Sequence, residues 1–202
     1  SMDLKEAMKS ALSDDPLKKL DNGGELLDIL PVKNLYLDVD SFSIVTNKVV
    51  SKSDFGRIQK RISWSLGNRS FILKNDMMIL DLLTNNNWER PIYFTSASEE
   101  ACVGLKDYLQ SEGIAFRLVP IKQTEEEMMQ GGRVNTDAMY DNIMHKFEWG
   151  GMNKPGVNLD ENCLRMPANL RMQMGILANA LINEGKKEKA NTENKEKKDG
   201  VS

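Results

Sequence analysis

The chain has 202 residues, of which 40% are hydrophobic and 28% are charged, and its formal net charge is −3. This length is enough for one substantial hydrophobic core and a small helical appendage. The negative charge argues against a nucleic-acid-binding protein, since no basic excess is present to displace phosphate counterions. No apolar run approaches the roughly 18 residues of a membrane-spanning helix, so we expect no direct membrane insertion.

The first forty residues predict a short helix followed by a strand. Residues 3–12 form the helix, which the sequence SDDP ends, and the sequence DNGG at 21–24 is a turn. Farther along, Leu35, Leu37 and Val39 alternate with polar residues. Alternation with period two is typical of a strand that has one buried and one solvated face.

The next segment predicts a hairpin, a helix and a strand, all of them short. Residues 44–50 place two apolar pairs on either side of a Thr-Asn-Lys turn, as in a β-hairpin. Asp54 can cap a helix that carries Phe55 and Ile62. Residues 70–73 are expected to form a strand.

The centre of the chain predicts a second, longer helix. Asp76 caps this helix, and apolar residues recur at the spacing of one helical face at Ile79, Leu82 and Leu83. The asparagines at 85–87 end the helix, because asparagine tolerates the left-handed conformation of a helix exit.

The segment after that helix predicts a βαβ unit. A strand at 92–94 follows Pro91. Ser96 and Glu99 form a capping box for a helix, and a second strand is expected at 114–121. Strand, helix and strand in this order predict a parallel pair with a right-handed crossover.

The C-terminal third is predicted to be helical. Thr136 caps one helix, and a loop at 149–162 leads to a last helix at 167–184. One face of the last helix is apolar and needs a cover, either the α/β core or a further helix. The residues of this face are Leu170, Met174, Leu177 and Leu181.

These elements predict an α/β fold class: a small mixed sheet that contains a βαβ unit, with flanking helices and a helical C-terminal segment. The predicted domains are a helical or irregular extension at 1–30, an α/β domain at 31–130, a helical segment at 131–190 and a disordered tail at 191–202. The tail has too little apolar content to fold.

Candidate binding residues come from two places. Asp38 and Asp40 resemble the D-x-D pair that holds a divalent metal in many nucleotide-sugar glycosyltransferases, and both carboxylates point to the same side of a strand. The solvated face of an edge strand gives the same pattern. Trp149, with Asn153 and Asp160, is either a platform for sugar hydroxyls or a buried anchor of its loop. A shared pocket of these residues would make a small sugar- or metal-binding domain.

The remaining reactive residues predict neither a catalytic site nor a cofactor. Cys102 and Cys163 are the two cysteines and His145 is the single histidine, and these three are not at zinc-ligand spacing. Cys102 is expected to be a buried thiol, with a disulfide to Cys163 left open. His145 lacks a second base or a paired nucleophile, and no glycine-rich phosphate loop occurs.

Four segments together resemble one family. They are LPVKNLYLDVD (residues 30–40), NDMMILDLLTNNNWERPIYFTS (75–96), GLKDYLQSEGIAFRLVPI (104–121) and GRVNTDAMYDNIMHKFEWGGMN through LDENCLRM (132–166). The family is a bacterial group of large polytopic membrane proteins of unknown function. Its membrane portion resembles the eukaryotic transmembrane protein O-mannosyltransferases.

The resemblance implies a place and a role for this chain. In the family the corresponding region follows the last membrane span, on the extracytoplasmic (periplasmic) face of the inner membrane. It is similar to an α/β domain followed by helical hairpins of the tetratricopeptide type, and residues 177–190 resemble the start of such a hairpin.

The resemblance therefore implies a soluble, non-catalytic accessory domain of a parent that is itself a glycosyltransferase-like membrane protein. Such a domain would pack beside the membrane portion of the parent or dock a polypeptide partner or substrate. The resemblance places no catalytic residue on this chain.

Overall fold

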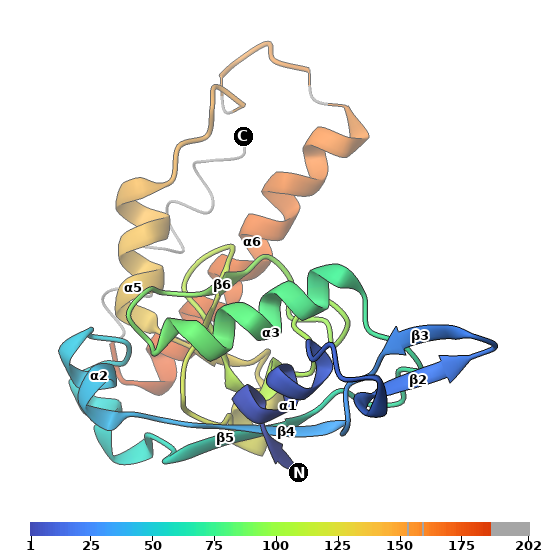
Figure 1. Ribbon diagram of the computed structural model, residues 1–202. Coiled ribbons are helices and arrows are strands. Elements are labelled where there is room, and N and C mark those ends of the chain that lie inside the picture. The colour runs from blue at the N-terminus through green and yellow to red at the C-terminus, as the bar shows by residue number, and fades with distance from the viewer. Residues whose placement is uncertain (153, 159, 187–202) are drawn as a thin grey trace. The chain divides into compact units, whose positions relative to one another are not determined.

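The computed structural model describes residues 1–152, 154–158 and 160–186 (Figure 1). The chain divides into two compact units, which are described separately. Unit 1 consists of Ser1–Tyr108 and Leu118–Lys122, and unit 2 consists of Leu109–Arg117 and the described residues from Gln123 onward. Helices and strands occur in both units, so the predicted α/β class is confirmed. The tail predicted at 191–202 lies outside the described residues.

Unit 1 is built on a three-stranded sheet. Its strands are, in spatial order, β1 (Met2–Asp3), β4 (Asn34–Asp38) and β5 (Arg61–Ser65). β1 runs parallel to β4, and β5 runs antiparallel to it. Leu35 lies opposite Trp64 and Leu37 opposite Ile62, and these four side chains are buried. The predicted strand with one wet face is therefore confirmed.

Helix α1 (Leu4–Ala11) connects β1 with β4. Its N-terminus is capped by Asp3, whose carboxylate accepts hydrogen bonds from the N–H groups of Lys5 and Glu6. The helix packs against β4 and against α3 (Figure 1). Because β1 and β4 are parallel, β1, α1 and β4 form a βαβ unit, although the sequence predicted such a unit elsewhere.

The connection from α1 to β4 contains a short 3₁₀ helix and a separate two-stranded hairpin. The elements are the 3₁₀ helix Pro16–Lys18, β2 (Lys19–Asn22) and β3 (Glu25–Asp28). Gly23 and Gly24 form the turn with φ values of 68° and 96°. A two-residue hairpin turn with positive φ at both positions favours glycine, so the predicted turn at 21–24 is confirmed.

Three predictions for residues 41–73 are wrong. A helix, α2 (Ser41–Thr46), replaces the first strand of the predicted hairpin, because Asp40 caps it by accepting the N–H of Phe42. The helix predicted after Asp54 is a 3₁₀ helix, Lys52–Arg57, and Ile62 lies in β5. Residues 70–73 form no strand.

Helix α3 (Lys74–Asn86) agrees with the prediction at its end but not at its start or in its buried face, where Leu80 and Leu83 are buried and Leu82 is 50% exposed. Asp76 lies in the first turn and accepts the N–H of Leu73 at 3.3 Å, so it caps the helix from inside the first turn. The helix ends where predicted, since Asn87 has the left-handed φ of 41°.

The helix predicted after Ser96 is absent. Strand β6 (Tyr93–Phe94) is followed by turns and by the 3₁₀ helix Lys106–Tyr108. Val103 and Gly104 have φ values of 52° and 81°, and a right-handed helix cannot contain such residues. The predicted strand at 114–121 is reduced to β8 (Phe116–Leu118).

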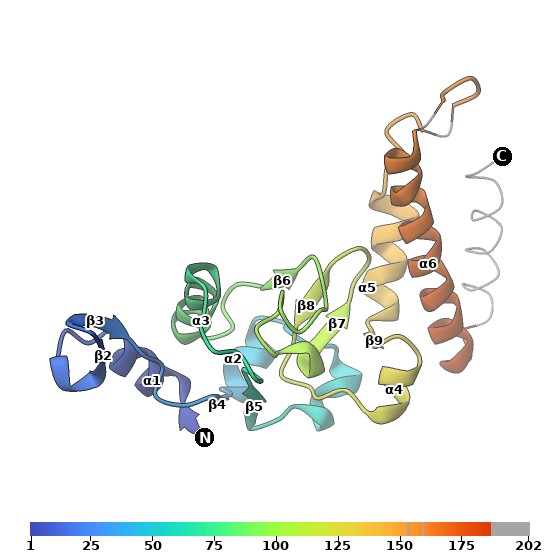
Figure 2. The ribbon, with the colours of Figure 1, turned by 90° about the vertical axis from the view of Figure 1, so that its right-hand side faces the viewer.

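Unit 2 combines a short parallel ladder with a helical hairpin (Figure 2). Its elements are β7 (Leu109–Ser111), α4 (Glu125–Met129), β9 (Arg133–Val134), α5 (Thr136–Asp141), a π-helical turn (Asn142–Lys146) and α6 (Glu161–Asn183). β7 pairs with β9 in parallel. Asn135, rather than Thr136, caps α5. Asp160 caps α6, so this helix begins earlier in the chain than the predicted start at Pro167.

The apolar face of α6 has its cover inside unit 2. Met139 of α5 and Ile143 of the π-helical turn pack against Leu170, Met174, Leu177 and Leu181 of α6. The sequence predicted that this face needs a cover. The helix that precedes α6 supplies this cover, rather than a helix that follows α6. Likeness to a tetratricopeptide hairpin stays a prediction. None of the helices described is long and apolar enough to cross a membrane.

Candidate functional site

The two acidic residues predicted from β4 both have structural partners. Asp38 accepts two hydrogen bonds from the guanidinium of Arg61, at 2.6 Å and 3.2 Å, and that guanidinium lies 3.9 Å from the ring centre of Tyr36. The hydrogen bonds from Arg61 hold the pKa of Asp38 below its ordinary value. Asp40 accepts the hydroxyl of Ser43 at 2.6 Å, which lowers its pKa as well.

The predicted aromatic platform lies in unit 2. Trp149 is half-buried against the apolar cluster of α5 and α6, as expected of a loop anchor. Asp160 accepts the N–H of Cys163 at 2.7 Å as the cap of α6, and this hydrogen bond lowers its pKa. Asn153 lies outside the described residues. Asp38 and Asp40 belong to unit 1, whereas Trp149 belongs to unit 2.

The two cysteines are free thiols. Cys102 is fully buried, as predicted, and burial raises the pKa of its thiol. Cys163 is exposed at the start of α6. Within the described residues, no group of three or more histidine, cysteine or acidic side chains could hold a metal ion.

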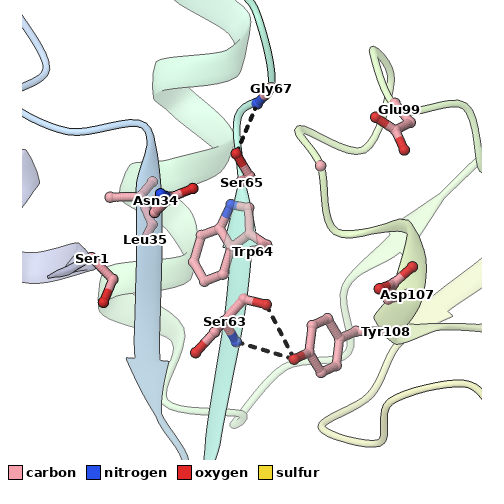
Figure 3. A pocket seen from close by; sticks show the side chains of 11 residues that line it. Ser1, Asn34, Leu35, Ser63, Trp64, Ser65, Gly67, Glu99, Asp107 and Tyr108 are labelled. Atoms are coloured by element: carbon pink, nitrogen blue, oxygen red, sulfur yellow. Dashed lines mark hydrogen bonds between the residues drawn. The ribbon is translucent and has the colours of Figure 1, made fainter.

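An open pocket of about 580 Å³ lies beside β4 and β5 in unit 1 (Figure 3). One wall carries the polar residues of the two strands, including Asn34 and Ser63, and the opposite wall carries Glu99, Asp107 and Tyr108 (Figure 3). These groups can donate to and accept from a polar ligand. Asp107 is partly neutralised by the ammonium group of Lys122, 3.5 Å away.

Two polar residues of this pocket, Tyr108 and Ser63, are hydrogen-bonded to each other at the edge of the sheet. The hydroxyl of Tyr108 accepts the N–H of Ser63 at 3.1 Å and donates to its carbonyl at 3.2 Å (Figure 3). This hydroxyl therefore replaces a neighbouring strand at the free edge of β5. The sequence gives no signal for this role, because Ser63 and Tyr108 lie 45 positions apart in the chain.

The backbone beside the pocket is strained and closely packed. Val103 is buried and β-branched and has a positive φ, which is rare for such a side chain. A Cβ atom on Gly104 would lie 2.2 Å from the carbonyl oxygen of Ser65. The indole N–H of Trp64 is buried next to this segment and has no hydrogen-bond partner among the residues that the structure describes. Because this N–H is closed to solvent, a ligand in the pocket cannot reach it.

A network of buried polar side chains holds the ladder of unit 2. Arg133 donates to Gln110 at 2.9 Å and pairs with Glu127 at 3.0 Å. Glu112 accepts from Gln110 at 3.0 Å and from Asn135 at 3.2 Å. These bonds join β7, β9 and the start of α5, and a satisfied buried network of this kind favours one unique packing arrangement.

A second concavity in unit 1, with a volume of about 690 Å³, is mainly apolar. It is called the N-terminal groove here. Its apolar side chains come from the end of α1, the hairpin β2–β3, the segment after the hairpin, and the segment between β5 and α3. The principal ones are Leu12, Leu20, Leu27, Ile29, Leu66 and Phe71.

Several large apolar side chains of the N-terminal groove are exposed to solvent. Leu12 is 62% exposed, Leu20 53% and Phe71 72%. Contiguous exposed apolar surface on a protein commonly marks an interaction site. No periodic pattern in the sequence joins these residues, which explains why sequence reasoning did not find the groove.

Comparison with known proteins identifies the family. The family described as TMEM260-associated domain 2 matches residues 1–138 of the chain. The chain belongs to this family. No curated protein and no solved structure matches it. The region shared with TMEM260-associated domain 2 contains the whole of unit 1, and with it both the open pocket and the N-terminal groove.

Proposed function

We propose that this chain is a non-catalytic accessory domain of a multi-spanning membrane protein of the TMEM260 type. In this proposal the parent is glycosyltransferase-like, and the domain lies on the extracytoplasmic face of the membrane. Its role is to dock a polypeptide: the membrane portion of the parent, a partner or a substrate.

The N-terminal groove is the observation that carries this proposal. It lies in the part of the chain that defines the family, and it exposes large apolar side chains from four different segments. A protein gains free energy when such a surface is covered by another apolar surface. The groove therefore supports a docking role better than the polar pocket beside β5 supports catalysis.

The other function predicted from the sequence is sugar or metal binding through Asp38, Asp40 and Trp149. It has weaker support, because both carboxylates hold hydrogen-bond partners that complete local structure. Calorimetric titration of the chain with manganese and with mannosides tests it directly. Heat that disappears in the Asp38→Asn variant would favour this function over docking.

Co-purification tests the docking role. The membrane portion of the parent and this chain are produced in the same cells as separate, differently tagged polypeptides, and the membrane portion is purified in detergent. We expect this chain to co-purify at a constant ratio, and an unrelated periplasmic domain with the same tag to be lost. Equal loss of both domains, combined with unchanged function of a parent that lacks this chain, would contradict the proposal.

A further inference from the structure

We infer that the N-terminal groove binds a polypeptide segment that carries at least two large apolar side chains next to a carboxylate. This inference rests on the proposed function and specifies its site and the chemistry of the partner. It is drawn from the apolar lining of the groove, the incomplete hairpin at its side, and the charges that remain unpaired inside it.

The hairpin presents one apolar face to the groove. Leu20 of β2 and Leu27 of β3 are directly opposite each other in the ladder, so their side chains lie on the same face, and both line the groove. Phe71 reaches the groove from the segment before α3 and is 72% exposed. Two or more large apolar side chains of a partner can therefore be buried here.

The hairpin is incomplete as a sheet. β2 and β3 form a two-stranded sheet that extends away from the three-stranded sheet of unit 1 (Figure 1). Nearly all of its residues are exposed. A two-stranded hairpin is marginally stable in water, and it becomes stable when a further strand or a packed apolar segment covers it. A polypeptide in the groove supplies that cover.

Charge distinguishes the partner. Lys33 and Lys74 line the groove, and neither ammonium group has a carboxylate partner among the described residues. The carboxylate of Asp28 is already paired with Lys19 at 2.7 Å. Arg69 is also engaged elsewhere. The charge left inside the groove is therefore positive, and it complements a partner that carries a carboxylate.

One wall of the groove is held in place before any partner binds. Arg69 pairs with Asp76 of α3 at 2.9 Å, and it donates to the backbone carbonyls of Glu99 and Glu100 at 3.0 Å each. These bonds fix the segment that carries Phe71. A preformed wall reduces the ordering that binding requires, which favours a peptide-sized partner.

An anionic lipid surface fits the same groove less well. Glu25 lies on the same face of the hairpin as Leu20 and Leu27, and Asp28 lines the groove, so both carboxylates would face the headgroups. Carboxylates at this place are repelled by an anionic membrane, whereas a polypeptide that lies in the groove itself contacts the lysines.

Selection from a display library of random twelve-residue peptides tests the inference on the whole chain. We expect enrichment of peptides with two or more large apolar residues and an acidic residue. Fluorescence polarisation with an enriched peptide should show about tenfold weaker binding, or more, for Phe71→Ser, because burial of an aromatic side chain is lost. Lys74→Glu should weaken binding through charge. Leu17→Ser is the matched control, because Leu17 is 93% exposed beside the hairpin and does not line the groove.

Three results would overturn the inference. The first is equal binding by the chain and by Phe71→Ser, once circular dichroism and thermal unfolding show that the variant is folded. The second is groove-dependent sedimentation with phosphatidylglycerol vesicles, which would make a lipid surface the occupant. The third is a dimer in analytical ultracentrifugation that Phe71→Ser dissociates, which would make a second copy the occupant.

The same variant separates this inference from the proposed function. If Phe71→Ser still co-purifies with the membrane portion and library peptides bind it as they bind the unaltered chain, the docking role stands and the groove is not its site. If peptide binding depends on the groove but the chain never co-purifies, the groove inference stands and the proposed role beside the membrane portion is wrong.

Discussion

The close approach of Gly104 to β5 leads to the sharpest stability prediction. A Cβ atom at this position would lie 2.2 Å from the carbonyl oxygen of Ser65, and the backbone has a φ of 81°. Gly104→Ala therefore adds two separate penalties, a left-handed conformation for alanine and a steric overlap with the strand. Gly67 has a similar φ of 69°, but no atom of the described part of the chain lies within 4 Å of its Cβ position, so Gly67→Ala adds the first penalty alone.

The two penalties have different sizes. Placing alanine in the left-handed region costs roughly 1–2 kcal/mol. Overpacking of a closely packed site costs about 1–3 kcal/mol. Moving the segment away from β5 also strains the two hydrogen bonds of Tyr108, each of which contributes about 1 kcal/mol. We expect Gly104→Ala to lower the free energy of unfolding by about 3–5 kcal/mol, and Gly67→Ala by about 1–2 kcal/mol.

Urea denaturation followed by tryptophan fluorescence measures both variants, since Trp64 is buried in β5 next to Gly104. The difference between the two midpoints reports the steric overlap together with its effect on the hydrogen bonds of Tyr108, because the conformational penalty is common to both variants. Equal midpoints for the two variants would refute the close approach. An intact midpoint for Gly104→Ala would also refute the claim that this segment lies against β5.

Three further predictions concern the sheet edge, the helical hairpin and the ion pair. Tyr108→Phe removes the hydroxyl that bridges the edge of β5 and should lower unfolding free energy by about 1 kcal/mol in the same urea assay. Leu177→Ala leaves a cavity at a fully buried position in α6 and should lower the free energy of unfolding by about 2–5 kcal/mol. Ile182→Ala, at a position that is 48% exposed, should lower it far less. Similar losses for the two variants would contradict the packing of α5 on α6. The folded pKa of Asp38 is held below 3.8, so its contribution is present above that pH and is lost as pH falls below it. The melting temperatures of the chain and of Asp38→Asn should therefore differ at pH 7, and this difference should shrink as the pH falls through the lowered pKa of Asp38. A difference that stays constant with pH would exclude the ion pair as its source.

Local signals in the sequence were enough for several elements. The helix at 3–12, the strand around Leu35 and the end of α3 at Asn87 are set by neighbours within one or two turns of chain, through a cap, an alternation and a left-handed asparagine. The hairpin turn at 21–24 is set in the same way by glycines that accept positive φ.

Contacts between distant segments decided the elements that the sequence misassigned. The capping box at Ser96 and Glu99 predicted a helix, but the residues that follow form turns that bring Gly104 against β5 and the hydroxyl of Tyr108 to Ser63. A capping box stabilises a helix by about 1 kcal/mol, and contacts of this kind exceed it. The apolar face of α6 was predicted correctly, but its partner could not be, because many helices fit such a face.

The candidate site divides in the same way. Acidic residues at 38, 40 and 160 were visible as a pattern. Asp40 and Asp160 cap the helices that follow them directly, whereas Asp38 is engaged by Arg61, which lies in another strand. The N-terminal groove is assembled from segments around residues 11–33 and 66–77. The sequence by itself determined those local elements that depend on short-range backbone preferences, such as α1, β4 and the turn at 21–24. Only the tertiary structure decided which faces are covered and which stay open for a partner, because burial depends on residues that are far apart along the chain.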